Sequence, residues 1–252
     1  MSVRAVAFDW GGTLTPWFDV DLRERWMAYA TVFASDHAED LAQRLHAGEM
    51  QRWDRQFETA GHSGTGALEQ MFQECGVDTS SPRHAAALAA YLASWEPNTH
   101  TDPQAAPLLE RLRGRGLRTA VLSNTMWPRR HHEHVLERDG ILHLFDYLLF
   151  TSETPSAKPH ESVFADVMYH LDVEPSECVF VGDRLFACFP LREREHDLWI
   201  RLAAPDTTFE EAWPTSVVSS RSTAAAASLP ARRSVAPAAA LPATQLLEVT
   251  NG

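Results

Sequence analysis

The sequence predicts an α/β protein, built on a doubly wound parallel sheet with a small α-helical domain inserted near its start. Short apolar segments that end in glycine or polar residues alternate with segments of helical spacing, the pattern of a parallel sheet. The first apolar segment stops at Asp9 and is followed by Gly11 and Gly12. Residues 19–96 show helical patterns only, so we expect them to form a separate insert.

The first strand is expected over residues 3–8, a short apolar run that includes β-branched residues and ends before two glycines. Asp9 then stands at the carboxyl end of the strand. Ligands of open α/β sheets bind at that edge. The sequence therefore predicts that a site is built around Asp9.

Four helices are expected in the insert, because their apolar residues recur at helical spacing. Their expected bounds are 21–33, 38–57, 67–74 and 82–95. Ser81 and Pro82 predict an N-cap and a first helical residue for the last of them. The aromatic side chains Trp26, Trp53 and Phe57 are expected in the core of the insert.

The α/β alternation resumes after the insert. Strands are expected over 117–122, 147–150 and 178–181, and helices over 103–113, 127–139 and 161–171. Residues 198–202 are a weak candidate for a further strand. Residues 216–252 consist mostly of Ala, Ser, Pro and Arg, a composition typical of disordered segments. We therefore expect a core of residues 1–18 and 97–215, a helical insert at 19–96 and a disordered tail.

The composition limits the classes of partner. The chain has 252 residues and a net charge of −12, which argues against nucleic acid or an anionic membrane as the main partner. We expect a cytoplasmic protein, since no apolar run approaches a membrane span and the start lacks a signal-peptide pattern. The three cysteines form no CxxC pair, which agrees with a reducing compartment. The sequence does not specify an oligomeric state.

Four polar residues lie after expected strands and should converge at one edge of the sheet: Asp9, Ser123, Lys158 and Asp183. Asp9 is suited to act as a carboxylate nucleophile that forms an acyl-phosphate, and Ser123 to hold phosphate oxygens. Lys158, the only lysine of the chain, would neutralise the transferring group. The carboxylates of Asp9 and Asp183, with the Gly11 carbonyl, are suitable oxygen ligands for Mg²⁺.

The segments FDWGGTLT, VLSNT, AKP and VFVGDR occur in this order and together resemble the haloacid dehalogenase (HAD) superfamily. The helical insert is similar to the small cap of its first subclass. The resemblance implies a Rossmann-like core, a small phosphorylated metabolite as substrate and Mg²⁺ as cofactor. It implies that Asp9 is the nucleophile, that Lys158 assists it, and that Asp9, Gly11 and Asp183 hold the metal.

The resemblance also implies that Ser123 and Asn124 hold the phosphate, and we expect the loop at Trp10 and Gly12 to contact substrate. Trp10, Trp17 and Trp127 lie beside the expected site, where they would either line a substrate pocket or pack in the core. His131, His132 and His134 are expected on a solvated helix face, since neighbouring arginines would repel a metal ion.

Two departures from the family pattern bear on activity. Phosphatases of this family carry a second aspartate, a general acid and base, two residues after the nucleophile. That position is Gly11 here, and loss of such a group costs about 10²–10⁴-fold in rate. After Asp183 the family's further acid and glycine-alanine turn are absent. A frameshifted or truncated reading frame near Phe186 is a hypothesis that sequencing of the gene tests.

Three functions are compatible with these features. The first is Mg²⁺-dependent hydrolysis of a small phosphorylated metabolite, slowed by Gly11. The second is metal-independent 2-haloacid dehalogenation, whose enzymes also lack the second aspartate, although Asp183 speaks for a metal. The third is a catalytically degenerate protein that binds a ligand without turnover. A phosphonate hydrolase would need a lysine in the cap, which contains none.

Overall fold

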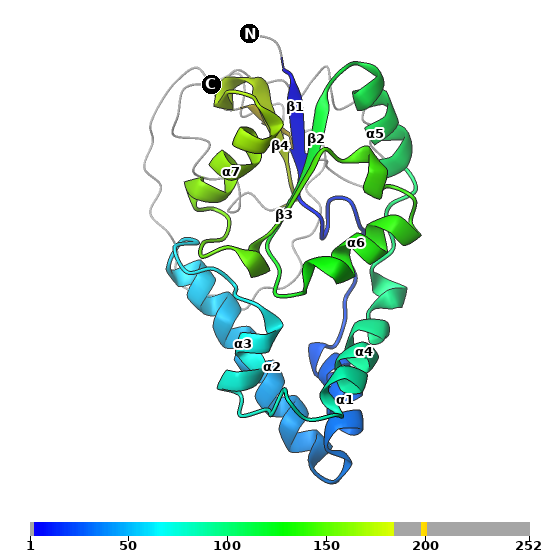
Figure 1. Ribbon diagram of the computed structural model, residues 1–252, viewed down its shortest axis with the longest axis vertical. Coiled ribbons are helices and arrows are strands. Elements are labelled where there is room, and N and C mark those ends of the chain that lie inside the picture. Colours follow the sequence, from blue (N-terminus) through cyan, green and yellow to red (C-terminus); the bar gives the residue numbers. More distant parts are fainter. Residues whose placement is uncertain (1–2, 184–197, 201–252) are drawn as a thin grey trace.

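The computed structural model describes residues 3–183 and 198–200, which include a parallel sheet with the order β3-β2-β1-β4-β5 (Figure 1). Its strands are β1 (Ala5–Phe8), β2 (Arg118–Ser123), β3 (Tyr147–Phe150), β4 (Cys178–Val181) and β5 (Leu198–Ile200). Every strand pairing is parallel. The predicted fold is confirmed, and the weak strand candidate near residue 198 contains a strand. The tail at 216–252 and the segment after Asp183 where the family pattern stops lie outside the described residues, apart from β5.

Helices cover both faces of the sheet, which makes it doubly wound (Figure 1). Alternate residues of β1 point to opposite faces. Val6 and Phe8 belong to an apolar cluster with α5 (Ala105–Gly114) and α6 (Arg129–Arg138). Ala5 and Ala7 belong to a second cluster with α7 (Glu161–Leu171). Because both faces are buried, β1 is apolar throughout, as expected for a parallel sheet.

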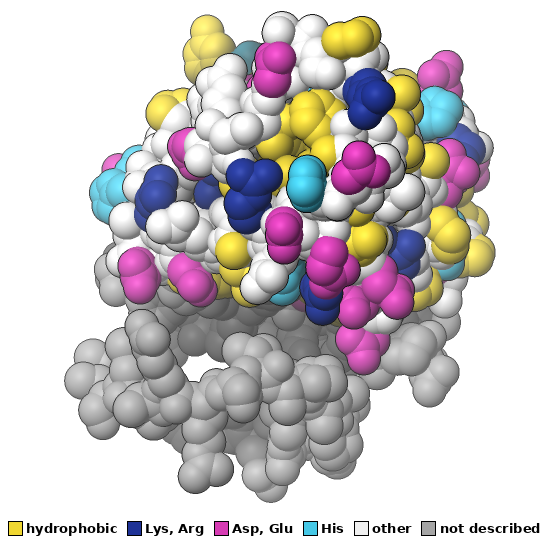
Figure 2. Space-filling model, turned by 90° about the horizontal axis from the view of Figure 1, so that it is seen from below, with side chains coloured by type: hydrophobic (Ala, Val, Ile, Leu, Met, Phe, Trp, Pro, Cys, Tyr) yellow, Lys and Arg dark blue, Asp and Glu magenta, His cyan; other side chains and the backbone are white. Residues whose placement is uncertain are grey.

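The helical insert has its own apolar core beyond the carboxyl ends of the strands (Figure 1). Its helices are α1 (Leu22–Phe33), α2 (Ala38–Glu58), α3 (Leu68–Glu74) and α4 (His84–Ser94). Fully buried aromatic side chains dominate this core, and Trp26 stacks on Tyr91 with ring centroids 4.1 Å apart. Figure 2 views the molecule from the insert's end and shows an apolar patch among interspersed acidic and basic side chains.

Two expectations for the insert were wrong. Helix α4 begins at His84, and Ser81 is not its N-cap. The Asp78 side chain instead accepts bonds from the main chain and hydroxyl of Ser80, so a turn precedes the helix. Phe57 is 44% exposed, because it follows the buried Gln56 and is rotated away from the buried face of α2. Trp26 is buried as expected, and Trp53 is partly buried.

The histidines of α6 also differ from expectation. His132 is 1% exposed, stacks on Phe150 at 4.4 Å and shares a 3.0 Å hydrogen bond with the hydroxyl of Thr125. His131 is partly buried, and among the three only His134 is exposed. The buried face of α6 runs through His132, Val135 and Leu136, so an imidazole replaces an apolar residue in the helical pattern. The expectation of a solvated face was therefore wrong for His132.

We expect the stability of the protein to fall as the pH drops below 6.5, because burial lowers the pKa of His132 to about 3. The unfolded chain takes up a proton there while the folded chain does not. Between pH 6.5 and 5, protonation of His132 in the unfolded chain lowers the free energy of unfolding by about 2 kcal/mol at most. Urea unfolding at pH 7.5 and 5.0 measures it, and His132→Leu should reduce the difference. The exposed His134→Leu is the control, and an equal reduction in both variants would contradict the prediction.

Candidate active site

Asp9 and Lys158 form a buried ion pair at the carboxyl end of the sheet. Asp9 follows β1, and its main-chain N–H donates to the Val181 carbonyl of the neighbouring β4 over 2.8 Å. The Lys158 ammonium lies 2.7 Å from Asp9 Oδ1, and their side chains are 1% and 12% exposed. The ammonium also donates to the Leu122 carbonyl over 2.8 Å and lies 5.2 Å from the centre of the Phe180 ring. The strands thus bring together two residues that are far apart in the sequence.

The two oxygens of the Asp9 carboxylate have different surroundings. Oδ1 accepts from the main-chain N–H of Trp10 over 2.7 Å and from the Lys158 ammonium. The hydrogen bond and the ion pair that residues 3–183 make to this carboxylate thus both fall on Oδ1. Oδ1 therefore holds the carboxylate in orientation, and Oδ2 accepts no hydrogen bond from these residues.

Asn124 holds the main chain of Lys158 on both sides. Its Oδ1 accepts from the Lys158 N–H and its Nδ2 donates to the Lys158 carbonyl, each over 2.9 Å. Gln56 of α2 donates to the same carbonyl over 2.8 Å. Both polar atoms of the Asn124 side chain therefore bind the main chain of Lys158.

Ser123 lies next to this pair. It is the last residue of β2 and directly follows Leu122, whose carbonyl accepts from Lys158. Ser123 is 3% exposed, and its hydroxyl makes no hydrogen bond to the described part of the chain. The hydroxyl is therefore free to bind an oxygen of a ligand at this edge.

Asp183 follows β4 and meets the loop after β1. Its main-chain N–H donates to the hydroxyl of Thr13 over 3.1 Å. Its Oδ2 accepts from the indole Nε1 of Trp17 over 2.8 Å. The same indole lies against Gly12, where an added Cβ would come within 2.0 Å of Trp17 Nε1. Trp17 is 59% exposed, so a surface tryptophan at the entrance to the insert orients this acid.

In the loop after β1, Trp10 contributes its side chain to the core and its main chain to the site. The Trp10 side chain is 8% exposed and packs edge-on against His132 at 4.9 Å, so it is part of the core. Its main-chain N–H serves the site by binding Asp9. Trp127 bridges the core and the insert, since its indole donates to the Tyr91 hydroxyl over 3.2 Å. Apart from its two chain neighbours, no described residue has an atom within 4 Å of the position that a Cβ on Gly11 would occupy.

The donors near Asp9 fit a hard cation such as Mg²⁺. The carboxylates of Asp9 and Asp183 follow adjacent parallel strands, and the Gly11 carbonyl belongs to the loop between Asp9 and Thr13. Mg²⁺ commonly takes one or two protein carboxylates and keeps several waters. No cluster of three or more His, Cys, Asp or Glu side chains suited to a metal occurs among the described residues.

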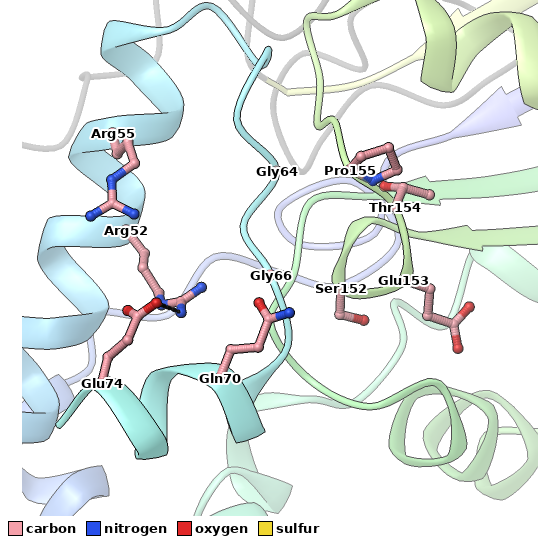
Figure 3. Close-up of a pocket in the computed structure, with 10 residues that line it drawn as sticks. All are labelled: Arg52, Arg55, Gly64, Gly66, Gln70, Glu74, Ser152, Glu153, Thr154 and Pro155. Atoms are coloured by element: carbon pink, nitrogen blue, oxygen red, sulfur yellow. Dashed lines mark ion pairs between the residues drawn. The ribbon is translucent and has the colours of Figure 1, made fainter. Parts of the chain in front are cut away.

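A separate pocket of about 400 Å³ lies between the insert and the loop after β3 (Figure 3). Its charged lining residues are Arg52, Arg55, Glu74 and Glu153. Arg52 and Glu74 are paired over 2.8 Å, so the two positive and two negative groups balance. The lining contains none of the predicted site residues, and its balanced charge gives no net attraction for a phosphate.

Comparison with known proteins relates the chain to a family of hydrolases. A family model for haloacid dehalogenase-like hydrolases matches residues 3–186. The chain is 26% identical over 183 residues to glyceraldehyde 3-phosphate phosphatase of Methanopyrus kandleri, covering 73% of this chain and 76% of that protein. It is 33% identical over 114 residues to ribulose-1,5-bisphosphate 5-phosphatase of Halopiger xanaduensis, covering 44% and 47% of the two chains.

Solved structures show the same fold. A HAD phosphatase from Thermococcus onnurineus superposes with a TM-score of 0.56 at 20% identity, covering 83% of this chain and 91% of that one. A HAD family enzyme from Bacteroides thetaiotaomicron gives 0.53 at 16% identity, covering 84% and 99%. In the described part of the chain, no helix has the length and apolar character to cross a membrane. With the family model matched over most of the chain, this protein belongs to the haloacid dehalogenase-like hydrolases.

Proposed function

We propose that the protein is a Mg²⁺-dependent phosphatase that acts on a small phosphorylated metabolite through an aspartyl-phosphate on Asp9. The observation that carries the proposal is the buried pair of Asp9 and Lys158, 2.7 Å apart, with no hydrogen bond or ion pair from residues 3–183 to Asp9 Oδ2. The phosphatases among its relatives support the same class of substrate.

The residues of the site suit two successive displacements at phosphorus. Asp9 Oδ2 attacks phosphorus, the bond from phosphorus to the leaving oxygen breaks, and that oxygen takes up a proton. Water then attacks the acyl-phosphate, which releases phosphate and restores the carboxylate. The Lys158 ammonium and the Ser123 hydroxyl stabilise the charge that develops on the phosphoryl oxygens. Asp9, Asp183 and the Gly11 carbonyl would hold Mg²⁺, which when bound supplies further positive charge beside the phosphoryl group.

Gly11 determines which substrates turn over well. It supplies no side chain to protonate the leaving oxygen, so the proton must come from water or from the substrate itself. Substrates with a good leaving group, such as acyl phosphates and aryl phosphates, should therefore react faster than alkyl phosphates.

The test is phosphate release from acetyl phosphate and p-nitrophenyl phosphate with and without Mg²⁺. Release that depends on Mg²⁺ supports the proposal. Metal-independent chloride release from 2-chloropropionate would replace it with dehalogenation. A thermal shift on phosphate ligands, with no turnover over a broad panel of substrates, would indicate a protein that binds such ligands without catalysis.

Asp183→Asn is expected to raise the Mg²⁺ concentration for half-maximal activity by at least about 10-fold, because it removes one of two carboxylates from the proposed metal site. Mg²⁺ titration of phosphate release gives the value. Asp54→Asn, an exposed position on α2, is the matched control and should keep the wild-type titration. Equal titrations for all three proteins would contradict the assignment of Asp183.

A further inference from the structure

The insert makes close main-chain contacts with the loop that carries Lys158. We call residues 56–64 of the insert and residues 155–160 of the core the lysine seam. The Gly64 N–H donates to the Pro155 carbonyl over 2.8 Å, and the Ala157 N–H donates to the Gly61 carbonyl over 2.8 Å. Figure 3 shows the chain at Gly64 running beside the loop at Pro155.

Glycines allow this close approach. Gly61 has a φ of +78°, and an added Cβ would lie 2.1 Å from the Ala157 carbonyl oxygen. At Gly64 an added Cβ would lie 2.7 Å from the Thr154 carbonyl oxygen. Both positions therefore exclude a side chain, and the two segments meet backbone to backbone.

Gln56 extends the seam to Lys158 itself. Its Nε2 donates over 2.8 Å to the Lys158 carbonyl, which also accepts from Asn124 over 2.9 Å. Gln56 is 3% exposed, and its Oε1 is buried without a donor among the described residues. Buried polar atoms are rarely left unpaired in proteins, so the unpaired Oε1 is a cost that accompanies the bond of Gln56 to Lys158.

We propose that Gln56 is a positioning residue, through which the insert keeps the Lys158 ammonium against Asp9. The Lys158 main chain is held from the core by Asn124 and from the insert by Gln56. Without the bond from Gln56, only the contact from the core remains, and the ammonium is less firmly fixed. The kinetic part of this inference rests on the proposed function, whereas the protection of Lys158 does not.

The chain offers a direct measurement, because Lys158 is its only lysine. Reductive methylation followed by mass spectrometry of the peptide reports the accessibility of this amine alone. Gln56→Leu and Gln56→Met remove the donor and leave the Lys158 carbonyl bonded to Asn124. We expect both variants to be methylated about 3- to 10-fold faster than wild type, the factor typical of one lost hydrogen bond. Gln51→Leu, an exposed position on the same helix, is the control and should match wild type.

The kinetic measurement separates positioning from a structural role. We expect kcat for p-nitrophenyl phosphate to fall about 3- to 10-fold in both Gln56 variants, with KM unchanged, at melting temperatures close to wild type. Equal methylation rates in the Gln56 and Gln51 variants would overturn the inference, and so would faster methylation with an unchanged kcat. If wild type releases no phosphate while the methylation contrast persists, the proposed function fails and the hold of Gln56 on Lys158 stands.

Discussion

Asp9→Asn is expected to lower phosphate release by at least about 10⁴-fold, because the amide is not a nucleophile and cannot form the acyl-phosphate. Asparagine has the same shape and keeps an oxygen that can accept from the Trp10 N–H and from Lys158. The change therefore removes the chemistry with little change in geometry. Initial rates with acetyl phosphate at saturating Mg²⁺ measure the effect.

The folded state of Asp9→Asn needs its own measurement. Removing one partner of a buried ion pair can destabilise a protein by about 3–5 kcal/mol, because the other charge is left unpaired. Here the Leu122 carbonyl still accepts from the Lys158 ammonium, which limits the loss. Urea unfolding shows whether the variant is folded under assay conditions, and Asp54→Asn controls for the loss of one carboxylate. A folded Asp9→Asn that keeps a tenth or more of the wild-type rate would refute the covalent mechanism.

Gly11→Asp is expected to raise kcat for alkyl phosphates by about 10²–10⁴-fold, the contribution of a positioned general acid and base. The described residues leave room for it, since none of them apart from the two chain neighbours has an atom within 4 Å of an added Cβ. The backbone of Gly11 is also outside the left-handed region that would disfavour a side chain. Steady-state kinetics with an alkyl phosphate, such as glycerol phosphate, measure the gain.

The leaving group provides an internal control for Gly11→Asp. p-Nitrophenolate leaves without a proton, so its phosphate ester should gain much less than an alkyl phosphate. Gly11→Asn has nearly the same shape but carries no titratable proton, and it should gain little on either substrate. If Gly11→Asn and Gly11→Asp accelerate the alkyl phosphate equally, acid catalysis is not the missing function.

The sequence predicted that Asp9 and Lys158 would lie close together, because both follow strands of one parallel sheet. Carboxyl ends of parallel strands share one edge, so residues after β1, β2 and β4 had to lie near one another. Lys158 follows a longer loop, yet its position as the only lysine beside a predicted site singled it out. The resemblance in four ordered motifs then assigned the roles that we propose.

Other features could not be predicted from the sequence, because they depend on contacts between distant segments. Gln56 and Lys158 are 102 residues apart, and Trp17 and Asp183 are 166 apart. No local pattern specifies such pairs. His132 was missed for a different reason, since its helix is polar in composition and an imidazole does not register as a buried residue.

The lysine seam has a consequence for how such proteins can be recombined. Here the main chain of the insert is bonded to that of residues 155–157. Exchange of the insert between proteins therefore also affects the core loop to which it is bonded. A chimera with a foreign insert should hold Lys158 as firmly as this chain does only when that insert forms the same main-chain bonds to the loop at 155–160.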